Sequence, residues 1–463
     1  MDLLFYIGLG VTLAVIVGLA IWTGTHAAKG KRTLSAPLVA GAIMGTLVGG
    51  SSTVGTAQLA FQFGFSAWWF TLGAGIACLV LALTLVIPLR RTGCATLVGI
   101  LRREYGEGTG MVVSVLSATG IFINIISQMI SGTAVLAVIW PVLGTEAAVA
   151  ITVGFMVLYV IFGGTKGTGV VGMMKMTLLY LATILCGGMI LHLTGGICGW
   201  IDAVKAIPDE TNFFSLFARG LGTDGGACLS LILGVLTTQT YAQAVLCGKS
   251  DKAAVTGAVA SAFLIPPIGV GGILVGLYMR ANQALYPGLT AKTALTTFVT
   301  AHMPPLVAGV ILGALFVTVV GGGAGLALGI ATIVQNDIVP RLHSRSLSDA
   351  GKDRLTKLWI ALVLVAAGCL SCGALGDTIL QFAFMSMGLR GAVVFAPLVF
   401  AMCLPGRVKP GYAMTSAIAG ALLVLVFGIW KVLPIDSLFL GTGTAVLIML
   451  WGLLQGKRAP ILL

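Results

Sequence analysis

The sequence predicts an all-α integral membrane protein with about 13 transmembrane helices, each long enough to cross a bilayer. Of its 463 residues, 58% are hydrophobic and only 9% are charged, a balance that excludes an ordinary soluble globular domain. Apolar runs of about 20 residues, the length that crosses a hydrocarbon core of about 30 Å, recur along the whole chain. Two of these runs are longer than the bilayer requires, and they indicate how the others are arranged.

The expected spans fall into five consecutive regions. Residues 1–36 hold an extra helix at 3–23, which opens on Asp2 and lacks the basic start of a cleaved signal peptide. Two five-helix regions follow at 37–195 and 226–404, with an outer loop at 196–225 between them. Residues 405–463 hold two C-terminal helices and a short tail. The twelve further spans are expected at 37–62, 66–89, 111–141, 145–163, 173–195, 226–246, 254–279, 304–334, 358–376, 378–404, 412–432 and 436–455.

The net charge of +12 reports orientation in the membrane. With the N-terminus outside, five of the 26 lysines and arginines fall in outer segments, Arg390 falls inside a span, and all the others fall in inner segments. This asymmetry follows the positive-inside rule, and it predicts a cytoplasmic C-terminus in a cell (inner) membrane. The basic balance therefore calls for a lipid bilayer, and no nucleic-acid or obligate protein partner is expected. The five outer residues are Lys205, Arg219, Arg280, Lys292 and Lys431.

The two long spans, 111–141 and 304–334, are five spans apart. Because five is odd, they lie in opposite orientations, as an inverted repeat of five helices plus five would place them. The first helix of each half, 37–62 and 226–246, is interrupted by polar residues. Paired broken helices at corresponding positions in two halves are typical of a transporter's binding site at the membrane midplane.

These interruptions supply the candidate solute-binding residues, together with one face of the first long span. An unpaired backbone group in hydrocarbon costs several kcal/mol, so such breaks persist where they face protein, water or a ligand. Interhelical hydrogen bonding is the alternative role for the same polar side chains. The candidates are Gly49, Gly50, Ser51, Ser52, Thr53, Gln128, Thr237, Thr238, Gln239 and Gln243.

Four stretches resemble the sodium/solute symporter family, whose members share the LeuT-type inverted repeat. They are "GGSSTVGTAQLAFQFGFSAWW" (49–69), "TLVGILRREYGEGTG" (96–110), "TTQTYAQAVLCGKSDKAA" (237–254) and "ATIVQNDIVPRL" (331–342). A fifth stretch, "RGAVVFAPLVFAM" (390–402), is similar to the family's tenth core helix. The resemblance implies a LeuT-like fold with one extra N-terminal and two extra C-terminal helices. It also implies alternating-access transport of a small organic solute, usually coupled to sodium.

The sequence departs from this family at the cation site. The resemblance places sodium ligands on backbone carbonyls of the first core helix, around Val48, and on adjacent hydroxyls of the eighth. Those hydroxyl positions here are Gly321 and Gly322, with Thr318 one turn away, and an aspartate position of the fifth core helix is Gly172. Side chains at these points supply no oxygen, so we expect no cofactor and transport that does not require Na⁺. A conventional Na⁺-coupled symporter with a shifted site stays open as an alternative.

Two cations lie where ions are costly. Arg390 sits at the centre of its span with no acidic residue at its depth, so it either binds carbonyls of the broken helices or contacts an anionic, carboxylate-bearing solute. Lys175, one turn beyond Gly172, either snorkels to the inner interface or places its ammonium in the vacated cation site.

Two other function classes fit the sequence less well. A channel or uniporter remains an alternative, although repeated pore helices and charged rings are not seen. An intramembrane enzyme would need catalytic carboxylates, a Ser/His pair or a metal cluster within the spans, and none is present. Cys369 and Cys372 form a C-x-x-C pair on an apolar helix without a second pair, which favours packing over a metal site.

Overall fold

The computed structural model describes residues 2–25, 34–208, 212–339, 349–372, 379–430 and 436–455. Within these ranges the secondary structure is helical, apart from one isolated bridge between Leu34 and Gly248. The first half holds α1 (Leu3–Thr25), α2 (Ala36–Leu47), α3 (Thr56–Phe63), α4 (Trp69–Val80), α5 (Val86–Arg91), α6 (Leu97–Tyr105), α7 (Glu107–Ile139), α8 (Thr145–Leu193) and α9 (Ile197–Lys205). The second half holds α10 (Leu221–Thr237), α11 (Gln239–Leu246), α12 (Asp251–Leu264), α13 (Pro266–Ala281), α14 (Ala294–His302), α15 (Pro305–Ile333), α17 (Asp349–Cys372), α18 (Ile379–Cys403), α19 (Pro410–Trp430) and α20 (Ser437–Gln455).

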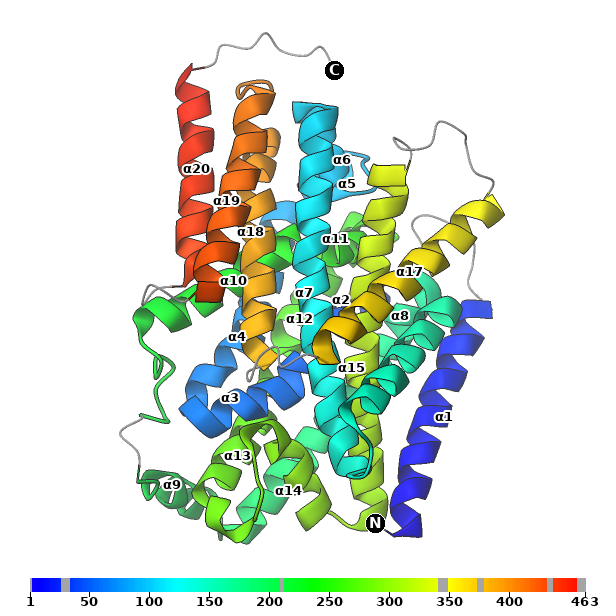
Figure 1. The fold of residues 1–463 in the computed structure, drawn as a ribbon, viewed down its shortest axis with the longest axis vertical. Helices are drawn as coiled ribbons and strands as arrows, with labels where there is room; N and C mark the ends of the chain where they lie inside the picture. Colours follow the sequence, from blue (N-terminus) through cyan, green and yellow to red (C-terminus); the bar gives the residue numbers. More distant parts are fainter. Residues whose placement is uncertain are drawn as a thin grey trace.

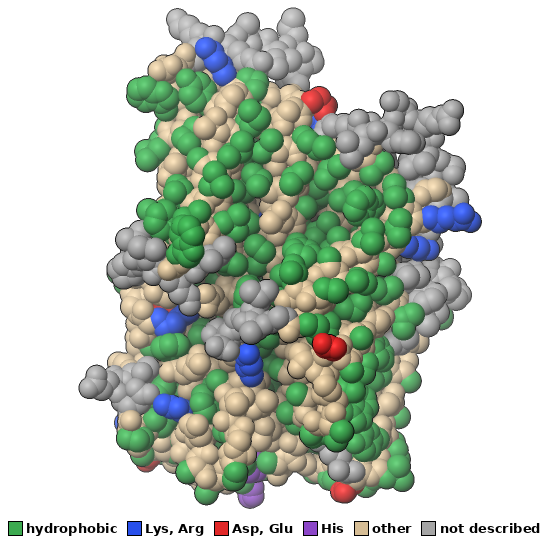
Figure 2. All heavy atoms as spheres, in the orientation of Figure 1, with side chains coloured by type: hydrophobic (Ala, Val, Ile, Leu, Met, Phe, Trp, Pro, Cys, Tyr) green, Lys and Arg blue, Asp and Glu red, His purple; other side chains and the backbone are tan. Residues whose placement is uncertain are grey.

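The all-α membrane fold is confirmed. Among the described residues, nine helical segments are long and apolar enough to cross a membrane, and the bent pair α10–α11 makes a tenth. Together with three shorter apolar helices, at Leu3–Ile16, Ala36–Leu47 and Thr145–Val160, they account for every span that the sequence predicts. The start of α1 and the end of α20 lie at opposite ends of the molecule, as an odd number of spans requires (Figure 1). On the face in Figure 2, hydrophobic side chains are spread from one end of the molecule to the other and charged side chains are few, as contact with lipid demands.

The two long helices of the predicted repeat form the centre. α7 and α15 pack against each other, α18 packs on α7, and α15 and α18 are the most deeply buried of the candidate spans. The two broken helices, α2–α3 and α10–α11, pack beside this centre (Figure 1). The orientation-setting residue Lys431 and the basic residues within 26–33, 340–348 and 456–463 lie outside the described residues.

α8 differs from the expected pair of separate helices. The sequence predicts a connection between 163 and 173, yet the helical backbone continues there, because the segment contains no proline and each glycine costs only about 1 kcal/mol. The chain nevertheless turns back within α8. The Tyr159 hydroxyl and the Lys175 ammonium both lie within 3.6 Å of the Cβ position of Gly321. Sixteen residues of straight helix span about 24 Å, farther than these two side chains reach together, so the two parts of α8 run in opposite directions.

The connections hold helices that the sequence did not indicate. The outer loop at 196–225 contains α9 and the first turn of α10, and the segment before α15 contains α14. On the opposite side, the short helix α6 joins the end of α5 to α7. Thr96 caps α6 by accepting a hydrogen bond from the Gly99 amide at 2.9 Å, a normal N-cap contact.

Candidate functional site

The first core helix breaks at Val48, whose backbone leaves the helical region with φ −87° and ψ 95°. The predicted interruption of this helix lies here: Gly49 and Gly50 follow the break, and Ser51–Gly55 is wound as a single π-helical turn. Hydroxyls satisfy the carbonyls that the break releases. Ser52 donates to the Leu47 carbonyl at 3.1 Å, and Thr53 donates to the Gly49 carbonyl at 3.2 Å. Two of the three consecutive hydroxyls therefore serve the backbone of their own break, whereas the Ser51 hydroxyl lies 2.9 Å from the Ser127 hydroxyl on α7.

The glycines at this break allow α7 to approach closely. A Cβ at Gly49 would lie 2.5 Å from the Gln128 Oε1, and one at Gly50 would lie 2.3 Å from the Ser131 Cβ. Gln128 uses this space: its Oε1 accepts from the Gly50 amide at 2.7 Å, and its Nε2 donates to the Ser51 hydroxyl at 3.2 Å. The structure thus brings Gln128 and the first break together as one hydrogen-bonded unit.

The first helix of the second half breaks at Thr238, and its two parts, α10 and α11, meet at an angle of 50°. The Thr237 hydroxyl donates to the Leu233 carbonyl at 2.6 Å, and the Thr238 hydroxyl donates to the Gly234 carbonyl at 2.5 Å. Both hydroxyls donate to carbonyls of the preceding helical turn, so the side chains at this break also satisfy the backbone of their own helix.

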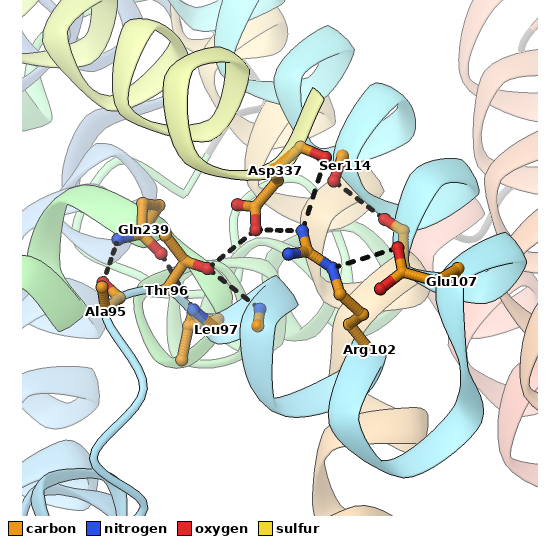
Figure 3. Close-up of polar contacts among 10 residues, drawn as sticks. Ala95, Thr96, Leu97, Arg102, Glu107, Ser114, Gln239 and Asp337 are labelled. Carbon is orange, nitrogen blue, oxygen red and sulfur yellow. Dashed lines mark hydrogen bonds and ion pairs between the residues drawn. The ribbon is translucent and has the colours of Figure 1, made fainter. Parts of the chain in front are cut away.

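The two glutamines of this segment point away from the break. The Gln239 Oε1 accepts from the Leu97 amide at 3.0 Å, and its Nε2 donates to the Ala95 carbonyl at 3.2 Å (Figure 3). Gln243 accepts from the Thr332 hydroxyl at 3.5 Å and lines a small cavity between α2, α11 and α15. The sequence predicts both amides at the midplane break, whereas their hydrogen bonds lie beyond it. The helical turn that restarts at Gln239 carries them toward the end where α5 and α11 finish.

Arg390 is fully buried on α18 and faces the second break. Its Nη1 donates to the Thr238 hydroxyl at 2.8 Å, its Nε to the Ser386 carbonyl at 3.0 Å, and its Nη2 to the Ser386 hydroxyl at 3.0 Å. Ser386 was not a candidate from the sequence, although its position four residues before Arg390 places both on one helix face. Gly120 on α7 makes room for the Arg390 side chain, because a Cβ there would lie 2.6 Å from the Arg390 Cγ.

Lys175 lies in the predicted cation region and does not snorkel to an interface. Its side chain is buried, with 1% exposed, and its ammonium donates to the Gly45 carbonyl at 2.5 Å and the Thr318 carbonyl at 3.4 Å. Gly45 lies one turn before the first break, at the end of α2. The ammonium therefore joins the first core helix to α15.

Of the three glycine positions predicted for the cation region, Gly321 lies beside this ammonium. The Cβ position of Gly321 is 3.6 Å from the Lys175 Nζ, and that of Gly322 is 3.1 Å from the Gln128 Oε1. Gly172 lies at the crossing of α8 and α2, where a Cβ would be 2.0 Å from the Gly41 carbonyl oxygen. The Thr318 hydroxyl donates to the Ala314 carbonyl at 2.7 Å within its own helix.

Comparison with known proteins establishes the family. Residues 29–420 match the sodium:solute symporter family. The chain belongs to this family. A relative in Bacillus subtilis (strain 168), the uncharacterized symporter YwcA, is 29% identical over 180 residues, which cover 36% of this chain and 35% of that protein. The match thus spans about a third of the curated relative's length.

Solved structures of symporters share the fold. The substrate-bound outward-open state of a Na⁺-coupled sialic acid symporter matches with a TM-score of 0.81 at 16% identity, covering 100% of both chains. MhsT in complex with L-phenylalanine matches with a TM-score of 0.59 at 13% identity, covering 91% of this chain and 99% of that one. These likenesses confirm the LeuT-like architecture of this sodium:solute symporter family member, and both its family and its fold are those of transporters.

Within this family member, the predicted site residues separate into three groups. Gln128 bonds the first break, Arg390 bonds the second break, and Lys175 bonds the Gly45 and Thr318 carbonyls beside Gly321. The Gln239 and Gln243 side chains join none of these groups. Sequence reasoning missed the Gly45 carbonyl, whose position one turn before the break was the available signal.

Proposed function

We propose that this family member moves a small organic solute by alternating access without requiring Na⁺, and that the Lys175 ammonium takes the place of the ion. The observation that carries this proposal is the contact of Lys175 with the carbonyls of Gly45 and Thr318. These carbonyls belong to the two helices, α2 and α15, that the family resemblance assigns to the sodium site. A tethered cation there would join the two helices as a bound ion would.

The residues around this region do not fit a sodium ion. A desolvated cation needs several oxygen ligands, whereas Gly321 and Gly322 supply no side-chain oxygen. The Thr318 hydroxyl is engaged with its own helix backbone. The ammonium of Lys175 already occupies the Gly45 carbonyl, and its positive charge repels a second cation.

The positive side chains buried in the spans favour an anionic solute. Lys175 and Arg390 are buried in the spans, and none of the ion pairs among the described residues includes either of them. Two buried positive charges without a carboxylate lower the free energy of a bound anion. We therefore infer a carboxylate-bearing solute that lies near Thr238 and Arg390 at the second break. Its carboxylate would accept hydrogen bonds from the guanidinium N–H groups that remain available.

Orientation follows from charge. We infer an outer N-terminus and a cytoplasmic C-terminus in the cell membrane, because the basic residues concentrate in the segments that this orientation places inside.

Two measurements test the proposal. A thermal-shift screen of the purified full-length protein, comparing small carboxylates with their amides, should identify a solute that stabilises only in its charged form. Uptake of that solute into proteoliposomes is then measured with Na⁺ replaced by K⁺ or choline. Equal rates in the three salts support the proposal, while uptake that collapses without Na⁺ favours the conventional symporter. Flux without saturation or counterflow indicates a channel.

A further inference from the structure

A buried polar network lies at the end of the molecule where α5, α11 and α15 finish, hereafter the inner end (Figure 3). Its centre is Asp337, in the π-helical turn η6 (Val334–Ile338) that follows α15, with a side chain only 1% exposed. Arg102 of α6 pairs with the Asp337 carboxylate, and the Thr96 hydroxyl donates to the same oxygen at 3.2 Å. Arg102 of α6 and the N-cap residue Thr96 therefore both bind Asp337, and they hold this short helix against the end of α15.

The same helix contacts the second broken helix through Gln239. The Gln239 amide accepts from the Leu97 amide and donates to the Ala95 carbonyl, so it bonds the backbone on both sides of Thr96. Gln239 is 3% exposed and directly follows Thr238, the partner of Arg390. The start of α6 is therefore hydrogen-bonded to the residue next to the proposed solute contact.

The helices on the other side of Gln239 are tied into one body. Arg90 at the end of α5 donates to the carbonyls of Val245 and Gly248 at 2.7 and 2.8 Å and pairs with Asp251 at 2.6 Å. The Leu34 amide donates to the Cys247 carbonyl at 3.0 Å, which joins the chain before α2 to the end of α11. The two broken helices are thus tied to each other at the inner end, whereas Gln239 reaches across from them to α6.

We propose that the Gln239 amide and the backbone at 95–97 form an inner latch, which must open before solute can leave at this end. Arg102, Thr96 and Asp337 are positioning residues that hold the fixed half of this latch. The movable half is the broken helix that carries Thr238, so a shift at the solute contact strains the two Gln239 hydrogen bonds directly. A cavity lies between α2, α11 and α15 and is lined by Thr46, Thr240, Gln243 and Cys247. Opening of the latch would make this cavity accessible from the inner end.

The chain contains a reporter for this opening. Cys247 lines the cavity and is half-buried, whereas Cys403 is exposed as the last residue of α18. Burial also raises the pKa of the Cys247 thiol, so opening should speed its alkylation through both access and thiolate formation. Labelling of the full-length protein with N-ethylmaleimide, followed peptide by peptide, measures both cysteines in one sample.

Gln239→Leu removes the two latch hydrogen bonds at nearly constant size. We expect it to speed Cys247 labelling by roughly five- to a hundredfold, the factor that two buried hydrogen bonds contribute together, with Cys403 unchanged. Arg102→Gln should act in the same direction by releasing α6. Arg103→Gln is the matched control, because Arg103 is exposed and its guanidinium donates only to the Thr92 carbonyl at 3.3 Å. Gln239→Asn, which keeps the amide but shortens its reach, replaces Gln239→Leu if the latter does not fold.

Unchanged Cys247 labelling in the Gln239 and Arg102 variants would overturn the latch. Equal acceleration of Cys247 and Cys403 would also overturn it, because that pattern reports general loosening. An Arg103→Gln variant that matches Arg102→Gln would remove the role of the Asp337 ion pair. The measurement uses neither solute nor sodium, so its outcome is independent of the proposed coupling.

Discussion

The first prediction is that Na⁺ does not bind the wild-type protein in preference to K⁺, and that changing Lys175 and Gly321 together creates such a preference. The Lys175→Ala substitution removes the ammonium from the Gly45 and Thr318 carbonyls. The Gly321→Ser substitution adds a hydroxyl at a position where a Cβ meets its nearest atoms at 3.5 Å, an ordinary contact distance. Gly322 is less suitable, since a Cβ there lies 3.2 Å from the Gly49 backbone.

The size of the effect follows from one oxygen atom. The Lys175 Nζ is 2.5 Å from the Gly45 carbonyl oxygen. A cation bound to that oxygen at roughly 2.4 Å, as hard cations bind, would lie within about 5 Å of the ammonium. At an effective dielectric constant of about 20, two unit charges 4–5 Å apart repel by about 3–4 kcal/mol. This free energy weakens binding by a factor of several hundred or more.

Thermal unfolding of the purified protein detects this difference without knowledge of the solute. A site with a dissociation constant of about 1 mM would stabilise the protein by about 2.7 kcal/mol in 100 mM Na⁺. The same site weakened three-hundredfold would contribute only about 0.2 kcal/mol. We therefore expect the wild-type melting temperature in NaCl to match that in KCl and choline chloride. The double variant should gain a Na⁺-specific increase that saturates with concentration.

A saturating, Na⁺-specific rise in the wild-type melting temperature would refute this reasoning, because the repulsion between the ammonium and an ion at the Gly45 carbonyl should keep the site nearly empty. Lys175→Ala alone serves as the control. It removes the repulsion but adds no ligand, so its sodium response should fall between those of the wild type and the double variant.

Three further predictions concern the solute contact, the first break and the outer end. Arg390→Lys keeps the charge but loses the planar fork that bonds two partners, so binding of an anionic solute should weaken at least tenfold by calorimetry. Gly50→Ala places a Cβ 2.3 Å from the Ser131 Cβ and should lower stability by about 1–3 kcal/mol, whereas Gly10→Ala, with open space around it, should not, by thermal unfolding. Burial raises the pKa of Asp436, so the folded protein holds that proton more tightly than the unfolded chain does; stability should rise as pH falls from 7 toward that pKa, and Asp436→Asn should remove the rise.

The architecture could be predicted from the sequence because the bilayer constrains it so strongly. Each span needs a long apolar run, and the two overlong spans were visible without any structural information. The helical backbone through the turn of α8 could not be predicted. Glycines lower helix propensity without forbidding a helix, and the packing of Tyr159 and Lys175 around Gly321 determines the path there.

The candidate site was predictable in location and less so in side-chain direction. The breaks at Val48 and Thr238 lie where the glycines and hydroxyls indicated them. The direction of Gln239 depends on where α11 restarts and on the presence of α6 beside it, and both are tertiary features. A polar residue in a broken helix is thus a weak guide to a ligand contact, because the neighbouring backbone competes for the same amide.

The departures from the family pattern at Gly172, Gly321 and Lys175 are best understood as one coordinated change. Gly172 permits α8 to cross α2 in contact with the Gly41 carbonyl, and this close crossing carries Lys175 to the end of α2. Gly321 then leaves room for the ammonium, since a serine hydroxyl there would extend toward an Nζ that lies 3.6 Å from the Cβ position. Changing any one of these residues alone to the type that the family pattern has there would therefore crowd the lysine or remove its contacts, and it would not complete the coordination shell of a sodium ion. Only a paired change, which removes the Lys175 ammonium and adds the oxygen of a serine at position 321, converts a site filled by a covalently attached cation into one that can bind a free ion. The double variant is therefore the decisive perturbation.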